Sequence, residues 1–233
     1  ITFVGCSRWL SGRAKKSYLL RGKAVLSIPN PIDTKVYHPM DQGMARELLG
    51  LPSGKRLLLF GALNVTDKRK GIDYLIEALR RMEKQDVELV VFGQVKDDIR
   101  GLFPVPIHSM GYLSDESKIV ALYNAVDMFI TSSLEENLPN TIMESMACGV
   151  PSIGFRVGGI PEMIDHQQNG YVANYRDTED LASGIHWVLE EADRAALKQA
   201  CLQKVAQNYS QHAVALKYIE VYNEAMAYKN YKL

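Results

Sequence analysis

Cysteine and histidine are scarce in this sequence, and neither is arranged as a disulfide framework or a metal site. The three cysteines, Cys6, Cys148 and Cys201, stand far apart among 233 residues, and no two form a CxxC pair. Such usage favours a protein of the reducing cytoplasm. The five histidines show neither HxxxH nor HExxH spacing, so we predict no zinc site.

Long apolar runs and an excess of charge of one sign are also missing. No stretch approaches the roughly eighteen residues of a membrane span, and no signal peptide is visible. Lys plus Arg and Asp plus Glu both number 27, which argues against a nucleic-acid binder that relies on bulk charge. Hydrophobic residues make up 47% of the chain, which is enough for a globular core.

What the sequence does have is a repeated alternation of short apolar runs and helical patterns. Several runs are apolar throughout, as expected for parallel strands that are buried on both faces. We predict strands at residues 25–29, 56–62, 87–93, 106–112, 126–132 and 150–155. The alternation implies βαβ units and therefore a doubly wound, Rossmann-like α/β domain with a parallel sheet. Ligands of such sheets bind outside the carboxyl ends of the strands, so the loops that follow strands are the candidate sites.

The segments between the strands carry helical stripes and caps. Residues 114–125 begin at Ser114, which we expect to be the N-cap, with acidic residues in the first turn. Residues 178–209 predict two helices, and residues 211–228 predict a terminal one. One apolar stripe at helical spacing is formed by Ile72, Leu75, Ile76, Leu79 and Met82.

The loop after the strand at residues 56–62 is basic. The strand ends near Gly61, the next helix is expected to begin near Gly71, and KRK (68–70) stands between them. Cations at a helix N-terminus are unfavourable by up to about 1 kcal/mol each, and a bound anion would reverse the sign. The loop is therefore either a phosphate site, with Lys70 and Arg69 as charged donors, or a solvated basic loop.

Two glutamates, Glu136 and Glu144, flank a Leu-Pro-Asn loop and the start of a helix. Asn140 or Thr141 is expected to cap this helix, which should stop at Gly149. Glu144 is either the partner of Thr141 in a T-x-x-E capping box or a carboxylate that binds ribose hydroxyls. Glu136 is either a solvated loop residue or a ligand of a second sugar. The two carboxylates together suit a nucleotide sugar.

Five segments resemble the C-terminal, donor-binding half of a family 4 (group 1) retaining glycosyltransferase of the GT-B fold. Their order and spacing hold over nearly the whole chain. The segments are IPNPIDTKVYHP (28–39), FGALNVTDKRKGIDYLIEAL (60–79), GYLSDESKIVALYNAVDMFITSS (111–133), EENLPNTIMESMACGVPSI (135–153) and FRVGGIPEMIDHQQNGYVA (155–173).

The resemblance implies a role for each matching residue. Glu144 would hold the nucleotide ribose and Glu136 would contact the donor sugar. Lys70 would neutralise the diphosphate and, with Glu136, serve catalysis. No cofactor is implied, and because no DxD motif is present, the cationic loop would replace a divalent ion. The other implied donor-binding residues are Arg69, Gly61, Asn137, Leu138, Pro139, Asn140 and Thr141, with Gly111, Tyr112 and Leu113 against the base.

The sequence departs from the family pattern at two positions. Ala62 stands where the family usually has an arginine, so Arg69 is the candidate replacement for its phosphate contact. Asn137 stands where glycine is common, which changes the loop expected to face the sugar. Gly158 and Gly159 either match a second glycine turn near the cleft or form a plain tight turn.

The resemblance also implies three parts. Residues 1–22 would be the tail of an N-terminal domain and a hinge, residues 23–210 the nucleotide-sugar-binding domain, and residues 211–233 a helix that packs back toward the N-terminal domain. The chain opens on Ile1 in an apolar run, so we expect an upstream half. A sugar or lipid-linked glycan acceptor would bind through that half, as would any peripheral membrane association, and the isolated chain should bind a donor without turnover.

The implied reaction is sugar transfer from a nucleoside diphosphate sugar to an acceptor hydroxyl with retention, as in polysaccharide or glycoconjugate biosynthesis. Two alternatives stay open. One is another GT-B enzyme, such as a nucleotide-sugar epimerase, which would need catalytic acids from both domains. The other is a non-catalytic nucleotide-binding module. Replacing Glu144 by alanine should abolish donor binding in the enzyme and should mainly cost stability if Glu144 is only a cap.

Overall fold

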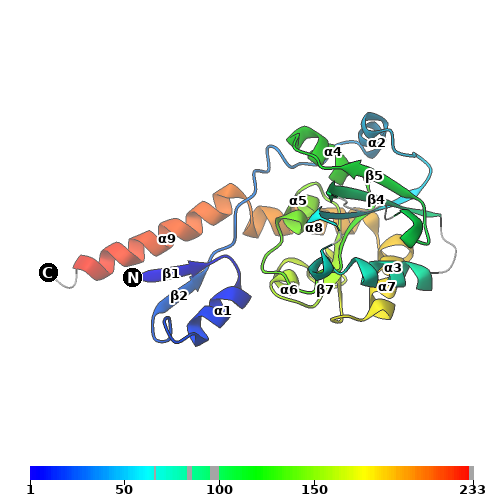
Figure 1. The fold of residues 1–233 in the computed structure, drawn as a ribbon. Helices are drawn as coiled ribbons and strands as arrows, with labels where there is room; N and C mark the ends of the chain where they lie inside the picture. Colours follow the sequence, from blue (N-terminus) through cyan, green and yellow to red (C-terminus); the bar gives the residue numbers. More distant parts are fainter. Residues whose placement is uncertain (66, 83–85, 95–99, 231–233) are drawn as a thin grey trace.

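The main domain is a six-stranded parallel sheet covered by helices on both faces (Figure 1). The computed structural model describes residues 1–65, 67–82, 86–94 and 100–230. The strands are β3 (Arg56–Asn64), β4 (Val87–Gln94), β5 (Ile107–Gly111), β6 (Met128–Thr131), β7 (Ser152–Phe155) and β8 (Gly170–Ala173). Their spatial order is β5-β4-β3-β6-β7-β8, and every neighbouring pair is parallel. The predicted doubly wound parallel sheet is therefore confirmed.

The central strand β3 divides the core into two layers. Successive side chains of a strand point to opposite faces, so Leu57 and Leu59 join one buried cluster while Leu58 and Phe60 join the other. The first cluster is covered by α2 (Gln42–Leu49), α4 (Glu116–Ala125), α5 (Asn140–Ala147) and α8 (Arg194–Asn208). The second is covered by α3 (Ile72–Arg81), α7 (Thr178–His186) and the π-helical turn η3 (Trp187–Glu191).

Helix α3 illustrates how the apolar pattern sets the packing. Leu75, Ile76 and Leu79 of the predicted stripe are all buried. Each such side chain contributes roughly 1.5–3 kcal/mol by leaving water. That gain outweighs the cost of the basic residues that precede this helix.

The helix boundaries largely follow the sequence pattern, with one correction. Residues 178–209 form two helices as predicted, and α9 (Gln211–Asn230) follows them. The N-cap of α4 is Asp115, whose carboxylate accepts from the backbone N–H of Ser117 at 3.0 Å, and not Ser114. A carboxylate also interacts favourably with the positive end of the helix, so Asp115 caps α4 in preference to the Ser114 hydroxyl. Residues 231–233, the end of the helical segment predicted at 211–233, lie outside the described residues.

A small unit formed by the first part of the chain stands beside the main domain (Figure 1). Its strands β1 (Thr2–Gly5) and β2 (Ala24–Ser27) are parallel and are joined by α1 (Arg8–Lys16). The prediction for residues 25–29 was therefore wrong about the partner: β2 pairs with β1 in a separate two-stranded sheet and does not enter the main sheet. A run of apolar residues specifies a strand but not the strand beside it.

The order of strands creates a switch point between β3 and β6. From β3 the chain proceeds outward through β4 to β5, and from β6 it proceeds outward in the opposite direction through β7 to β8. The connections after β3 and β6 therefore diverge and leave a crevice at the carboxyl ends of these two strands, where ligands of such sheets bind. The short 3₁₀ turn η1 (Lys68–Lys70) follows β3, and α6 (Ile160–Met163) follows β7.

The residues just before α9 lie against the connection from β2 to the main domain. Ile32 forms a bridge with Ser210, and its backbone N–H donates to Tyr209 O at 2.8 Å.

Another short turn, η2 (Arg100–Leu102), precedes β5. In the part of the chain described, no helix combines the length and apolar character needed to cross a bilayer.

Candidate functional site

Two neighbouring strands bring a cation and a carboxylate together at the switch point. The chain leaving β3 ends its 3₁₀ turn at Lys70, and the loop leaving β6 contains Glu136. The Lys70 Nζ atom lies 2.5 Å from Glu136 Oε1, with 33% of the lysine and 14% of the glutamate side chain exposed. Ion pairs open to water are worth only about 0–1 kcal/mol. The pair is therefore more important for where it places its charges than for stability.

Backbone contacts tie the loop after β6 to the loop after β3. The Ser132 hydroxyl donates to Gly71 O at 2.8 Å, and the Leu134 N–H donates to Arg69 O at 2.7 Å. Gly71 has a positive φ of 64°, and a Cβ there would lie 2.0 Å from Ser132 O. Only glycine fits such a close approach. The two hydrogen bonds then hold the loops at this distance.

The turn after β7 supports the same loop from another side. Gly158 has a φ of 56°, and a Cβ there would lie 1.6 Å from Glu136 O. The Gly159 N–H donates to Asn137 O at 2.6 Å. The second glycine turn is therefore a close backbone contact with the loop of Glu136, which a plain tight turn would not need.

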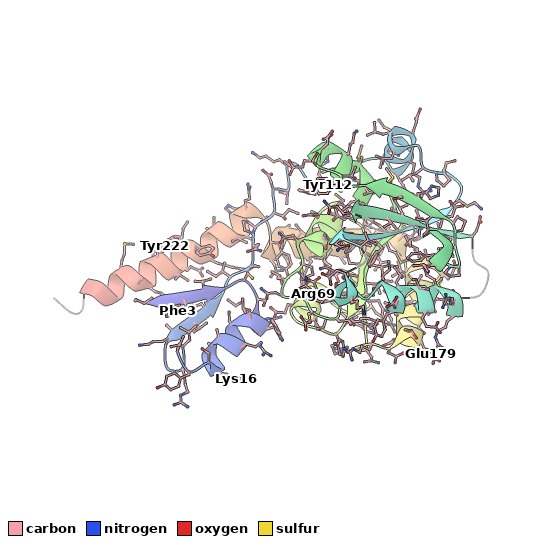
Figure 2. The ribbon with its side chains drawn as sticks, viewed as in Figure 1. Phe3, Lys16, Arg69, Tyr112, Glu179 and Tyr222 are labelled. Carbon is pink, nitrogen blue, oxygen red and sulfur yellow. The ribbon has the colours of Figure 1, made fainter. Side chains whose placement is uncertain are left out.

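A cleft of about 550 Å³ opens between α1 and these loops. It gathers four of the predicted site residues and adds side chains that the sequence did not single out. Figure 2 places Arg69 on the side of the main domain that faces α1. The lining residues are Trp9, Arg13, Arg69, Lys70, Glu135, Glu136, Asn137 and Val157.

Arg69 is held at the cleft by an acidic neighbour. Asp67 receives a bidentate contact from its guanidinium, with NH2 2.7 Å from Oδ2 and Nε 3.2 Å from Oδ1. This hydrogen bonding lowers the pKa of Asp67 to about 2. Arg69 remains 72% exposed, so the side chain can reach solvent or a ligand. Its use in place of the arginine missing at Ala62 stays a prediction.

Glu144 lies on the other side of α5 and has a different partner. The hydroxyl of the fully buried Tyr123 donates to Glu144 Oε2 at 2.8 Å. Burial raises the pKa of Glu144, the hydrogen bond from Tyr123 lowers it, and the nearby Glu116 carboxylate raises it. Burial likewise raises the pKa of Tyr123 well above its usual value. The carboxylate is thus half-buried with one neutral donor.

The capping-box interpretation of Glu144 was wrong. Helix α5 begins at Asn140 with Pro139 as its N-cap, so Thr141 already lies inside the first turn. No side-chain hydrogen bond caps this helix, and the Glu144 carboxylate is bound to Tyr123. The remaining interpretation, a ligand of ribose hydroxyls, stays a prediction.

The helix starts at the switch point lack side-chain caps, as does the short α6, whereas five other described helices have them. Neither α3, which begins after Gly71, nor α5 has a side-chain cap. Uncapped N-terminal N–H groups carry partial positive charge and can bind an anion. The capped helices are α1, α2, α4, α7 and α8, whose caps are Ser7, Asp41, Asp115, Asp177 and Asp193.

The other predicted donor-binding residues do not line the cleft. Packing requires glycine at position 61, because a Cβ on Gly61 would lie 1.8 Å from the Phe92 ring. Tyr112 directly follows β5 (Figure 2), and it is 62% exposed. Leu138 is buried, Pro139 and Thr141 are half-buried, Asn140 is exposed, Gly111 has a φ of 63°, and Leu113 packs against the core.

Two contacts that the sequence did not predict join the site to the first unit of the chain. The Ser7 hydroxyl donates to Asn137 Oδ1 at 2.6 Å, and Asn137 Nδ2 donates to Cys6 Sγ at 2.9 Å. The Glu162 carboxylate accepts from the backbone N–H groups of Arg8 and Trp9 at 2.8 and 2.7 Å. These partners are more than a hundred positions apart in the chain, so no local pattern reveals them. Among the described residues, no group of three or more His, Cys, Asp and Glu side chains is placed to hold a metal ion.

Comparison with known proteins gives relatives over most of the chain. It is 24% identical over 210 residues to the N-acetyl-alpha-D-glucosaminyl L-malate synthase of Bacillus anthracis, covering 88% of this chain and 55% of that protein. The structure superposes on a glycosyltransferase of Rickettsia africae with a TM-score of 0.83 and 22% identity, over 97% of this chain and 63% of the other. For the Anabaena protein HepE in complex with UDP-glucose, the TM-score is 0.77 at 18% identity, over 96% and 64%.

The match to a family model covers the sheet and both loops of the candidate site. The model describes glycosyl transferases group 1 and matches residues 54–191. The chain spans about half the length of the curated relatives it matches, and its fold is that of the C-terminal, Rossmann-like domain of GT-B enzymes. With the site at the switch point and this match over more than half its length, the chain belongs to the group 1 glycosyltransferases.

Proposed function

We propose that this chain is the donor-binding part of a retaining hexosyltransferase. The protein would transfer a sugar from a nucleoside diphosphate sugar to an acceptor hydroxyl, in polysaccharide or glycoconjugate biosynthesis. The observation that carries the proposal is the contact between Lys70 and Glu136 at the switch point, in a cleft lined by the loops that lead to the uncapped starts of α3 and α5.

The chemistry of sugar transfer explains why such groups would be needed. When the bond between the sugar and the diphosphate breaks, negative charge accumulates on the departing phosphate oxygens. Lys70, the free N–H groups at the start of α5 and, in place of the missing family arginine, Arg69 would stabilise that charge without a metal ion. Fixed donors of this kind need not reorganise at the moment of reaction, and in many enzymes they contribute more to catalysis than any other effect.

The two glutamates would hold the two sugars of the donor. Glu136, beside Lys70, would accept from hydroxyls of the transferred sugar, and Glu144 would accept from the ribose. The likeness to HepE in complex with UDP-glucose supports a nucleotide sugar as the donor. Gly111, Tyr112 and Leu113 would lie against the base. The remainder of the longer protein would supply most of the acceptor site, and the cytoplasmic location suggested by the cysteines stays a prediction.

Calorimetric titration of the chain with UDP, GDP and ADP tests donor binding. We expect one nucleotide to bind, with the affinity reduced by Lys70→Ala and lost in Glu144→Ala. Lys68→Ala is the matched control, because Lys68 is exposed in the same turn but does not line the cleft. Failure of all three nucleotides to bind would contradict the proposal for this chain.

The stereochemistry is tested on the longer protein. The anomeric configuration of the first product, observed by proton NMR, should match that of the donor. Inversion of the anomeric configuration would overturn the proposed retaining mechanism but would still be consistent with a glycosyltransferase. The isolated chain should bind donor but show no appreciable transfer.

A further inference from the structure

The wall of the cleft opposite Lys70 and Glu136 is formed by α1, through Trp9 and Arg13. These residues are four apart in the helix and therefore share a face. The Arg13 guanidinium carbon lies 5.3 Å from the centre of the Trp9 ring, a cation–π arrangement. The indole is 40% exposed. The cleft thus has an aromatic surface with a cation beside it, facing the residues proposed to hold the donor.

Helix α1 is held in this place by side chains of the main domain. Glu162 accepts from the backbone N–H groups of Arg8 and Trp9, which are the first two residues of the helix. Asn137 binds both Cys6 and Ser7, and Ser7 caps the helix. A carboxylate at a helix N-terminus is favourable by charge as well as by hydrogen bonding. Trp9 and Arg13 are therefore fixed relative to the loop of Glu136.

The charges lining the cleft leave Arg13 without an acidic partner. Glu136 pairs with Lys70. Arg69 pairs with Asp67 and also feels the charge of Glu135. Among the described residues, Arg13 makes no ion pair within 4.0 Å, and its contact is the Trp9 ring. Of the three basic side chains that line the cleft, Arg69 and Lys70 are thus paired with carboxylates, and Arg13 on the side of α1 is not.

The chemistry of this pair indicates one class of ligand. An aromatic face packs against the C–H face of a sugar or cyclitol ring, and a guanidinium binds carboxylate or phosphate groups through two parallel hydrogen bonds. We propose that Trp9 and Arg13 form an acceptor subsite for a hexose or cyclitol that carries a carboxylate or a phosphate. The acceptor role rests on the proposed function. Across the cleft from Glu136, an acceptor hydroxyl would face the donor sugar.

The subsite is tested by titrating the UDP-loaded chain with glucose 6-phosphate, glucuronate and glucose. Glucose 6-phosphate and glucuronate should each bind at least tenfold more tightly than glucose. Arg13→Gln should bring both affinities down to that of glucose, while Trp9→Leu should weaken all three. Lys15→Gln is the control, since it removes the same charge from the opposite face of α1, and it should change nothing.

Three results would overturn the subsite. The first is equal affinity for the charged and neutral sugars, or no binding of any of them. The second is an unchanged preference in Arg13→Gln. The third is a loss of UDP affinity in Arg13→Gln, which would make Arg13 a ligand of the nucleotide. Failure of UDP itself to bind would count against the proposed function and not against this subsite, because the three sugars can be titrated without nucleotide.

Discussion

The two glutamates that flank the start of α5 lie in contrasting surroundings. Both are partly buried, but Glu136 lines the cleft beside α1 and contacts a cation, whereas Glu144 contacts the neutral hydroxyl of Tyr123 in α4. The loop of Glu136 is fixed by backbone approaches at Gly71 and Gly158. Glu144 is fixed by its own helix and one buried ring.

This difference shows how a loop and the helix that follows it can present two carboxylates with separate properties. Glu136 has an ammonium group as its partner, while burial disfavours the charged form of Glu144, whose hydrogen-bond partner is a neutral hydroxyl. The first can offset or release a cation near a diphosphate. The second has an unused accepting capacity that vicinal hydroxyls could fill. Four substitutions test the contrast.

The largest effect is expected from Gly158→Ala, which acts on the Glu136 side alone. The new Cβ would collide with Glu136 O and force a positive φ on alanine. Strain and overpacking together should lower the free energy of unfolding by about 2–5 kcal/mol, measured by urea denaturation. Gly12→Ala in α1 is the control, because nothing lies within 4 Å of its new Cβ. An equal effect of the two substitutions would remove the argument for a glycine-dependent loop.

Tyr123→Phe is expected to act on the Glu144 side alone. It leaves a half-buried carboxylate without its donor, which should cost about 1–3 kcal/mol in thermal or urea unfolding. Tyr112→Phe, at an exposed ring, should change stability by less than about 0.5 kcal/mol. If Tyr123→Phe matches this control, the hydrogen bond to Glu144 does not contribute to the folded state.

Removing each carboxylate should change nucleotide affinity in opposite directions. Glu136→Gln frees Lys70 from its ion pair, so UDP should bind more tightly, by up to about tenfold or 1.4 kcal/mol. Glu144→Gln removes a charged hydrogen-bond acceptor for the ribose hydroxyls. The affinity for UDP should therefore fall by about tenfold, again roughly 1.4 kcal/mol. Calorimetric titration measures both. Changes of the same sign would show that the two glutamates do not differ as argued.

The smallest effect is the pH dependence of stability carried by Glu144. Burial raises its pKa above the ordinary value of 4.5. Its contribution therefore favours folding at low pH and is lost as the pH rises through the folded-state pKa. Glu144→Gln removes this pH dependence. The free energy of unfolding of the variant, relative to that of the wild type, should therefore increase as the pH rises above 4.5. Thermal unfolding across that range checks the sign, and a constant difference would contradict it.

Local patterns were sufficient for most of the main domain. The apolar runs correctly predicted five strands of the sheet, because strands buried on both faces must be apolar throughout. They missed β8, whose four residues include Gly170 and the half-buried Tyr171 and leave too short a pattern. The basic loop ending at Lys70 and the acidic loop at Glu136 were also identified, since each directly follows a strand.

By itself, the sequence determined the class of fold, the apolar faces of the helices and the two loops that carry the candidate site. Those features depend on neighbouring residues and on backbone periodicity. Only the tertiary structure decided that β2 pairs with β1, that Glu144 meets Tyr123 and that Asn137 binds Cys6 and Ser7. These contacts depend on the order of strands in space, which brings β3 beside β6 and residues more than a hundred positions apart into hydrogen-bonding distance.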